Sequence, residues 1–146
     1  MDSIDYEAQC KKIRKTNDEY LAMFREDLKK SGLKENTISR HLGNVDFYIN
    51  DFLLYYDALP METGLEEIDS FLGDFFIRKC MWSTPATIRS TAASLKKFYK
   101  SMLNHGFIKP DAYQDFCQEI KDSMNDWQSD CAQFNDPDAP NPFMFF

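Results

Sequence analysis

The chain has 146 residues, of which 43% are hydrophobic and 15% are aromatic, so it is long enough to bury a core without disulfide staples. Val occurs once and Gly five times, a composition that argues against a sheet protein. The net charge of −7, taken alone, argues against a nucleic-acid partner. No apolar stretch is long enough to span a bilayer and the first ten residues contain no signal core, so we expect a cytoplasmic protein without a membrane partner.

Apolar residues recur every three or four positions in five stretches of the chain, which is the period of a helix. The predicted helices cover residues 5–30, 35–56, 64–80, 85–105 and 110–132. Gly32 and Gly106 are stop signals after the first and fourth helices, and Thr84 followed by Pro85 is a start signal for the fourth. The polar run from Thr16 to Asp18 is a candidate break in the first helix. We therefore expect an all-α fold of about five helices.

The last twelve residues, 135–146, contain three prolines and are not expected to form a helix. Their three phenylalanines, Phe143, Phe145 and Phe146, would be costly to leave in water. We expect this Pro- and Phe-rich tail to dock on the domain or on a second copy of the chain. Residues 1–134 are expected to form one domain.

The sequence contains no pattern that indicates an enzyme, a metal or a cofactor. Its four cysteines lie at unpaired spacings, far from either histidine, and are expected to be free and mostly buried in a reducing cytosol: Cys10, Cys80, Cys117 and Cys131. Nucleophile-elbow, zinc-protease and phosphate-loop motifs are absent from the sequence. Acidic pairs such as Glu66 and Glu67 favour a solvated or dipole-stabilising role over acid–base chemistry.

The charge is unevenly distributed along the chain. Residues 75–110 carry seven basic residues and no acidic one, whereas residues 111–146 carry one basic and eight acidic residues. A stretch of this length without a carboxylate is the least random charge feature of an acidic protein, and it coincides with the fourth predicted helix. The acidic last third would repel DNA if it lay near that helix, or it could fold over the basic residues and mask them.

The order of the helices resembles the core-binding, SAM-like N-terminal domain of tyrosine recombinases and phage integrases. Its second helix is similar to GLKENTISRHLGNVDFYINDFLLYY, residues 32–56, where a Gly-Leu turn precedes Thr-Ile and an apolar stripe. Its fourth helix is similar to STPATIRSTAASLKKFYKSMLNHGFIKP, residues 83–110, with a Leu-x-x-Phe-Tyr core and a Gly-x-Ile end before a proline. The resemblance covers about residues 17–120 and implies a compact orthogonal bundle of the integrase N-terminal type.

The resemblance also implies DNA binding, DNA recombination and integration, and a mobile element. It departs at Lys34, where the family usually places a Ser or Thr helix cap. No catalytic domain follows these helices, so no catalytic residue is carried over and strand transfer is not expected. We expect a stand-alone, non-catalytic relative of the module, although a fragment of a longer protein remains an alternative.

The fourth helix offers the candidate DNA-binding residues. At about 100° per residue, three of its basic side chains fall together beside the apolar stripe and a fourth lies just beyond them, which gives a ridge suited to phosphates or a major groove. The candidates on this helix are Arg89, Lys96, Lys97, Lys100, Thr84 and Thr87. The resemblance implies that the second helix also approaches DNA, through Lys34, Thr37 and Arg40. A merely solvated basic face is the alternative.

Three further residues have two interpretations each. Asn36 is either a DNA contact or the N-cap of the second helix, and His41 is favoured as a packed neutral histidine over a DNA contact. Trp82 is favoured for a core or rim position over stacking on a base. A second functional hypothesis is a protein-interaction or regulatory module that keeps the fold and associates through its acidic last helix and its tail.

Overall fold

The computed structural model describes residues 3–143, and every regular element within them is a helix. The long α-helices are α1 (Ser3–Lys30), α2 (Glu35–Asp46), α5 (Pro85–Asn104) and α6 (Pro110–Asn135). The short elements are η1 (Phe47–Phe52), η2 (Met61–Glu66), α3 (Ile68–Ser70), η3 (Phe71–Phe75) and α4 (Phe76–Lys79). Because η1 continues α2 and η3 joins α3 to α4, the described chain folds into five helical rods and the 3-10 turn η2. The prediction of an all-α fold with about five helices is confirmed.

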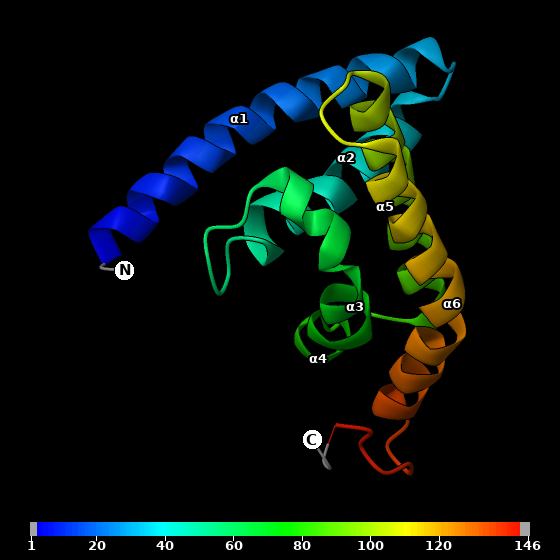
Figure 1. The fold of residues 1–146 in the computed structure, drawn as a ribbon. Coiled ribbons are helices and arrows are strands. Elements are labelled where there is room, and N and C mark those ends of the chain that lie inside the picture. The colour runs from blue at the N-terminus through cyan, green and yellow to red at the C-terminus, as the bar shows by residue number, and fades with distance from the viewer. Residues whose placement is uncertain (1–2, 144–146) are drawn as a thin grey trace.

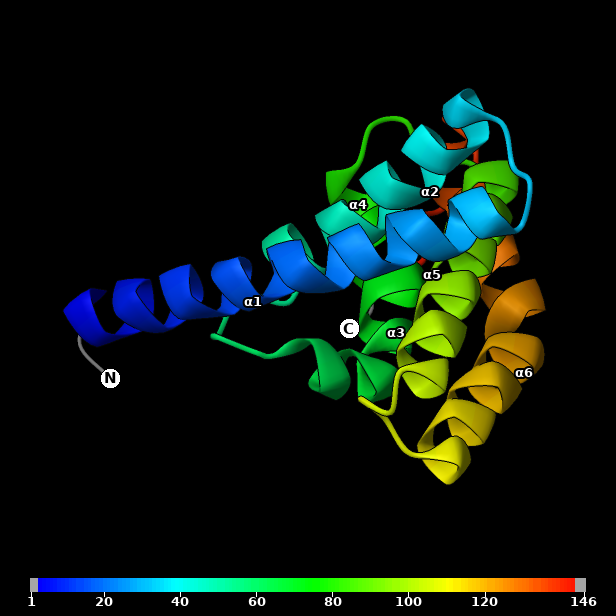
Figure 2. The ribbon, with the colours of Figure 1, turned by 90° about the horizontal axis from the view of Figure 1, so that it is seen from above.

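α5 is the central helix, because it packs against α6, α2 and α1. α6 runs beside α5, and α1 lies across the other helices at one end of the molecule (Figures 1 and 2). The side of α5 that carries Ile88, Leu95, Tyr99 and Met102 is fully buried. This burial fixes which side of α5 faces solvent, and with it the direction in which its basic residues point.

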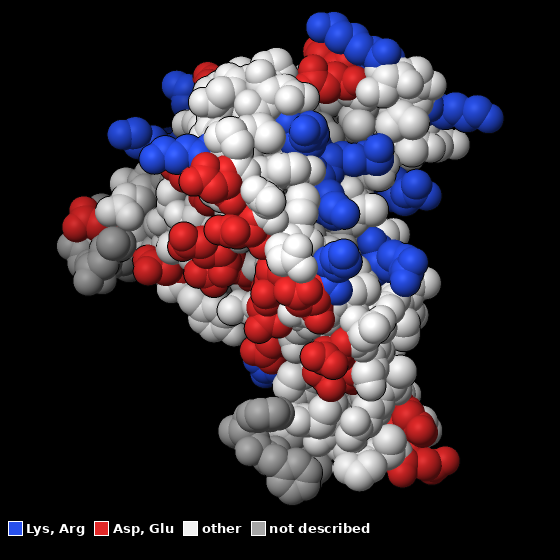
Figure 3. All heavy atoms as spheres, turned by 45° about the vertical axis from the view of Figure 1, so that its right-hand side comes forward, with Lys and Arg blue, Asp and Glu red and all other residues white. Residues whose placement is uncertain are grey.

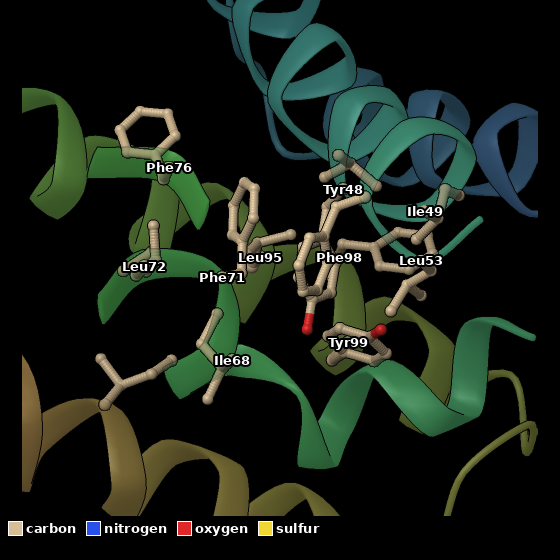
Figure 4. Packing of buried hydrophobic residues seen from close by; sticks show 14 of the residues in the cluster. Tyr48, Ile49, Leu53, Ile68, Phe71, Leu72, Phe76, Leu95, Phe98 and Tyr99 are labelled. Atoms are coloured by element: carbon tan, nitrogen blue, oxygen red, sulfur yellow. The ribbon is translucent and has the colours of Figure 1, made fainter. Parts of the chain in front are cut away.

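Two of the rods contain π-helical turns that the sequence period does not predict. The aromatic side chains of η1 pack against those of η3. The ring centroids of Tyr48 and Phe52 in η1 lie 4.8 and 4.9 Å from that of Phe71 in η3. Figure 4 shows Tyr48 and Phe71 within the buried cluster that Phe98 and Tyr99 of α5 complete. The wider π-turn inserts one extra residue per turn, which keeps successive large rings on the packed side.

The helix ends follow the glycine signals. Gly32 and Gly106 both have φ of +82°, a conformation that residues with a Cβ rarely adopt. After α1, Leu33 N donates to Leu28 O and Gly32 N donates to Lys29 O, the paired bonds of a Schellman motif. The predicted stops at both glycines are confirmed.

The candidate break at Thr16 to Asp18 does not occur, and α1 is continuous. Asn17 is 1% exposed and its Nδ2 donates to Ile49 O at 3.2 Å and to Asn50 Oδ1 at 2.8 Å. A polar residue in the middle of a helix is tolerated here because it pairs with a backbone carbonyl of the neighbouring π-helix. The second and third predicted helices are also corrected, since the former ends at Phe52 and the latter begins at Ile68 after η2.

The tail begins one residue later than expected, because α6 continues through Asn135, whose Nδ2 donates to Ser83 O at 2.7 Å. The ring of Phe143 meets that of Phe134 edge-on at 6.0 Å, and the guanidinium of Arg78 lies 5.8 Å from the Phe143 ring centroid. Phe145 and Phe146, which were also expected to dock, lie outside the described residues.

Candidate nucleic-acid interface

The start of α5 is fixed by a capping box, which engages two of the candidate residues. The Thr84 hydroxyl oxygen accepts from Thr87 N at 3.0 Å, and the Thr87 hydroxyl oxygen accepts from Thr84 N at 2.7 Å. The two hydroxyls also contact each other at 3.2 Å, and Thr87 donates to Thr84 O at 3.0 Å. Because these hydroxyls are used inside the cap, we leave Thr84 and Thr87 out of the proposed interface, and their contact with a phosphate stays a prediction.

The exposed side of α5 carries four cations: Arg89, Lys96, Lys97 and Lys100. We call this set the basic ridge. α5 itself contains no Asp or Glu. A groove lies on each side of the ridge, and Lys96 lines both of them. The ridge is therefore continuous with two hollows that a chain of phosphates could follow.

The first groove, about 610 Å³ in volume, lies between α5 and α6. From α5 it receives Arg89 and Lys96, and from α6 a polar row at helical spacing: Gln114, Gln118, Lys121 and Asn125. None of its lining residues is Asp or Glu, and its floor is apolar. Sequence reasoning missed this row because the last helix was treated as uniformly acidic. The four-three-four spacing of non-acidic polar residues would have revealed it.

The second groove, about 530 Å³ in volume, lies between α1 and α5. Lys97 and Lys100 of the ridge line it together with Lys30 from the end of α1, a cation that the sequence analysis also missed. The ammonium group of Lys100 lies 5.6 Å from the ring centroid of Tyr113, which places a cation–π contact at the groove edge.

One carboxylate, Asp27, lines the second groove, and it already has partners. Ser101 Oγ donates to Asp27 Oδ2 at 2.5 Å, and His105 Nε2 lies 3.0 Å from the same oxygen. Partial burial alone would raise the pKa of Asp27, but these hydrogen bonds outweigh it and the pKa is lowered. The one carboxylate of this groove is therefore already engaged in hydrogen bonds within the protein.

The remaining candidates belong to α2, a helix that packs against α5. Lys34 is the N-cap residue of α2, without a side-chain cap bond, and Asn36 lies inside the first turn, so the interpretation of Asn36 as the N-cap is wrong. Lys34 and Arg40 are exposed and Thr37 is partly exposed. The nearby charges of Arg40 on α2 and of Lys97 on α5 both lower the pKa of His41, so each of the two helices places a cation near this residue.

His41 joins α2 to α5 as a packed side chain. It is 6% exposed, and its Nδ1 lies 2.7 Å from the Ser94 hydroxyl oxygen, which also accepts from Asn44 Nδ2 at 3.0 Å. Burial lowers the pKa of His41, and the nearby charges of Arg40 and Lys97 lower it further. The interpretation of His41 as a packed histidine is confirmed, and its lowered pKa favours the neutral form.

The acidic residues of α6 occupy a different side of that helix from the polar row. They follow helical spacing and form what we call the acidic face: Asp111, Asp115, Glu119, Asp122, Asp126 and Asp130. At about 100° per residue, this face is centred roughly 100° from the polar row. Figure 3 shows the consequence, a band of Lys and Arg beside a separate band of Asp and Glu. The described acidic residues of α6 therefore flank the basic ridge without covering it.

Trp82 lies at the rim of the core, which is one of the two positions that the sequence favours. It is 59% exposed and its ring meets Phe47 and Phe76, so it occupies a rim position. Its ring lies edge-on to Phe47, at a centroid distance of 5.9 Å, and Met81 beside it is fully exposed. The physical reason is position, because the loop before a capped helix has no packed neighbour on its outer side.

No protein-family model, no curated protein and no solved structure matches the chain. The integrase resemblance accordingly stays a prediction.

None of the helices within residues 3–143 combines the length and the apolar character that a membrane crossing requires. Over the same residues, His, Cys, Asp and Glu side chains nowhere gather in threes as metal ligands would. The four cysteines are free, and all but Cys117 are buried, as predicted.

Proposed function

We propose that the chain binds DNA through the basic ridge and the two grooves beside it, as a module without catalysis of its own. One observation carries the proposal. The α5–α6 groove combines three cations with three carboxamides and has no carboxylate among its lining residues, in a protein with a net charge of −7. Cations attract phosphates, and carboxamides both donate to and accept from nucleic-acid groups.

The resemblance to integrase core-binding domains supports the same side of the molecule. It implies that the second and fourth helices of the family approach DNA, and these correspond to α2 and α5. Arg40 and Lys97 come from those two helices and lie close enough to act on the same histidine. A duplex placed along the basic ridge would meet both.

The test is a fluorescence anisotropy titration of labelled duplex DNA at several salt concentrations. The variant Arg89→Ala, Lys96→Ala, Lys100→Ala removes three ridge cations and is expected to bind at least tenfold more weakly. Each lost phosphate contact should also reduce the slope of log affinity against log salt by about 0.9.

A matched control removes the same charge elsewhere. Lys11, Lys12 and Lys15 are exposed on α1 and line neither groove, so replacing all three by Ala changes the net charge equally. The control is expected to keep most of the affinity. Equal losses of DNA affinity in the two triple variants would mean that only the net charge matters and not the basic ridge. Absence of binding by the native chain would refute the proposal.

The acidic face of α6 favours a second candidate function, association with a basic protein surface. Six carboxylates on one side of a helix form a surface that repels nucleic acid and attracts cations. Static light scattering of the full chain and of a version that ends at Asn135 would detect self-association through the tail. A monomer in both samples would count against the part of this candidate that involves the tail.

A further inference from the structure

A small pocket between α2 and α5 is separate from the two grooves. Its volume is about 220 Å³, and its lining residues are Gly43, Asn44, Phe47, Phe76, Trp82 and Thr91. Pockets for drug-sized ligands are typically about 300–1,000 Å³, so this one suits a single small ring system.

Aromatic rings form one wall of the pocket. Trp82 stands edge-on to Phe47 and to Phe76, with interplanar angles of 71° and 86°, yet 59% of its surface remains in water. Two neighbouring rings therefore hold the indole in place while leaving much of it without a packing partner. A flat ligand placed against it would remove apolar surface from water.

The pocket lining also includes two residues with hydrogen-bonding groups, Asn44 and Thr91. Thr91 is only 5% exposed, and its hydroxyl has no hydrogen-bond partner among the described residues. Within residues 3–143, the one fully enclosed side-chain polar atom without a partner is Asn17 Oδ1, so the Thr91 hydroxyl reaches open space in the pocket. Asn44 donates its amide to Ser94, which leaves its Oδ1 as an acceptor.

We propose that this pocket holds one unpaired nucleobase of bound DNA, an inference that rests on the proposed function. A base is flat, stacks on tryptophan, and carries donors and acceptors on its edge. The pocket is also linked to the helix that carries the basic ridge, because the lining residue Asn44 donates to Ser94 of α5 at 3.0 Å and His41 contacts the same hydroxyl at 2.7 Å. A base in the pocket would stay tethered to phosphates on the ridge. Paired bases are stacked inside the duplex, so the preferred ligand is single-stranded or locally unpaired DNA.

The chain carries its own probe for this test. Trp82 is exposed, whereas Trp127 is 2% exposed and donates to Asp69 Oδ1 at 2.7 Å, so a change in tryptophan emission on binding reports Trp82. An oligonucleotide is titrated as a single strand and as the matching duplex. The single strand is expected to quench the emission, and the duplex to bind with little quenching.

Three variants locate the base. Trp82→Ala removes the stacking wall and should weaken single-strand binding about tenfold, while Thr91→Val keeps the shape, removes the hydroxyl and should weaken it about fivefold. A Cβ added at Gly43, which lines the pocket, would meet no atom within 4 Å, and Leu favours a helix more than Gly does, so Gly43→Leu adds bulk at the pocket without a clash at the backbone. Duplex affinity should change little in all three.

The outcomes separate the two proposals. Suppose that anisotropy shows single-strand binding without quenching of tryptophan emission, and that Thr91→Val keeps the full affinity. The pocket would then be empty, and this inference alone would be overturned. Equal quenching and equal losses with both forms of DNA would place Trp82 at the edge of a duplex and also overturn it. Absence of binding by either form overturns both the inference and the proposed function.

Discussion

The turn η2 offers a sharp test of how the core is held together, because two buried phenols bind it. Tyr48 OH donates to Gly64 O at 2.6 Å and Tyr99 OH donates to Met61 O at 2.7 Å, and both tyrosines are 0% exposed. The substitution Tyr99→Phe leaves the buried Met61 carbonyl without its partner, which costs about 1–3 kcal/mol. With a typical urea m-value of about 2 kcal/mol/M, the unfolding midpoint should fall by about 0.5–1.5 M.

Tyr113→Phe is the matched control for this experiment. It deletes a hydroxyl from a half-buried tyrosine whose bond to Lys96 O is long, at 3.3 Å, so its cost should stay below about 0.5 kcal/mol. Urea unfolding followed by circular dichroism measures both variants. Equal midpoints for Tyr99→Phe and Tyr113→Phe would refute the idea that the phenol holds η2 to α5.

Three further predictions concern charge and backbone. Burial and neighbouring carboxylates raise the pKa of Asp130, so its ionised form destabilises the fold as the pH rises. Asp130→Asn should therefore increase the free energy of unfolding at pH 7 by less than about 1 kcal/mol, measured as a higher urea midpoint, and this gain should disappear in acid. Burial and nearby cations lower the pKa of His41, so its contribution to stability is present above about pH 6.5 and is lost as the pH falls. The urea midpoint of the native chain should therefore fall between pH 7 and pH 5, and His41→Gln should make this fall smaller. An equally large fall in the variant would assign the pH dependence to another group. Gly106→Ala, at a φ of +82°, should cost about 1 kcal/mol, whereas Gly43→Ala, in open helical space, should stabilise by up to about 1 kcal/mol; shifts of the same sign would contradict this.

The sequence predicts those parts of the fold that local chemistry decides. The Thr84-Pro85 start and the glycine stops at Gly32 and Gly106 depend on backbone conformation within a few residues, and each lies where it was expected. The π-turns η1 and η3 depend instead on aromatic rings that meet across the core. Because the insertion of one residue per turn is decided by that packing, the helical period alone cannot reveal it.

The candidate site divides in the same way. The exposure of Arg89 and Lys96 follows from the buried stripe of their own helix, so the basic ridge could be predicted. Lys30 and the polar row that begins at Gln114 belong to other helices, and only tertiary packing brings them to the grooves. Trp82 was assigned to the core or rim from its residue type, although its place before a helix cap is the better guide to its exposure.

An acidic protein can bind DNA if its charges are separated by more than the distance over which salt screens them. The Debye length is about 8 Å at physiological ionic strength, and a helix with its side chains is about 10–12 Å across. The acidic face of α6 is centred about 100° from the polar row, and its nearest carboxylate, Asp122, already accepts from Gln118 Nε2 at 2.8 Å, so salt weakens its repulsion of a phosphate chain on the basic ridge without removing it. Lysines in direct contact with phosphates are screened far less. The sign of the interaction is therefore decided by the face that the DNA meets, and not by the net charge of −7.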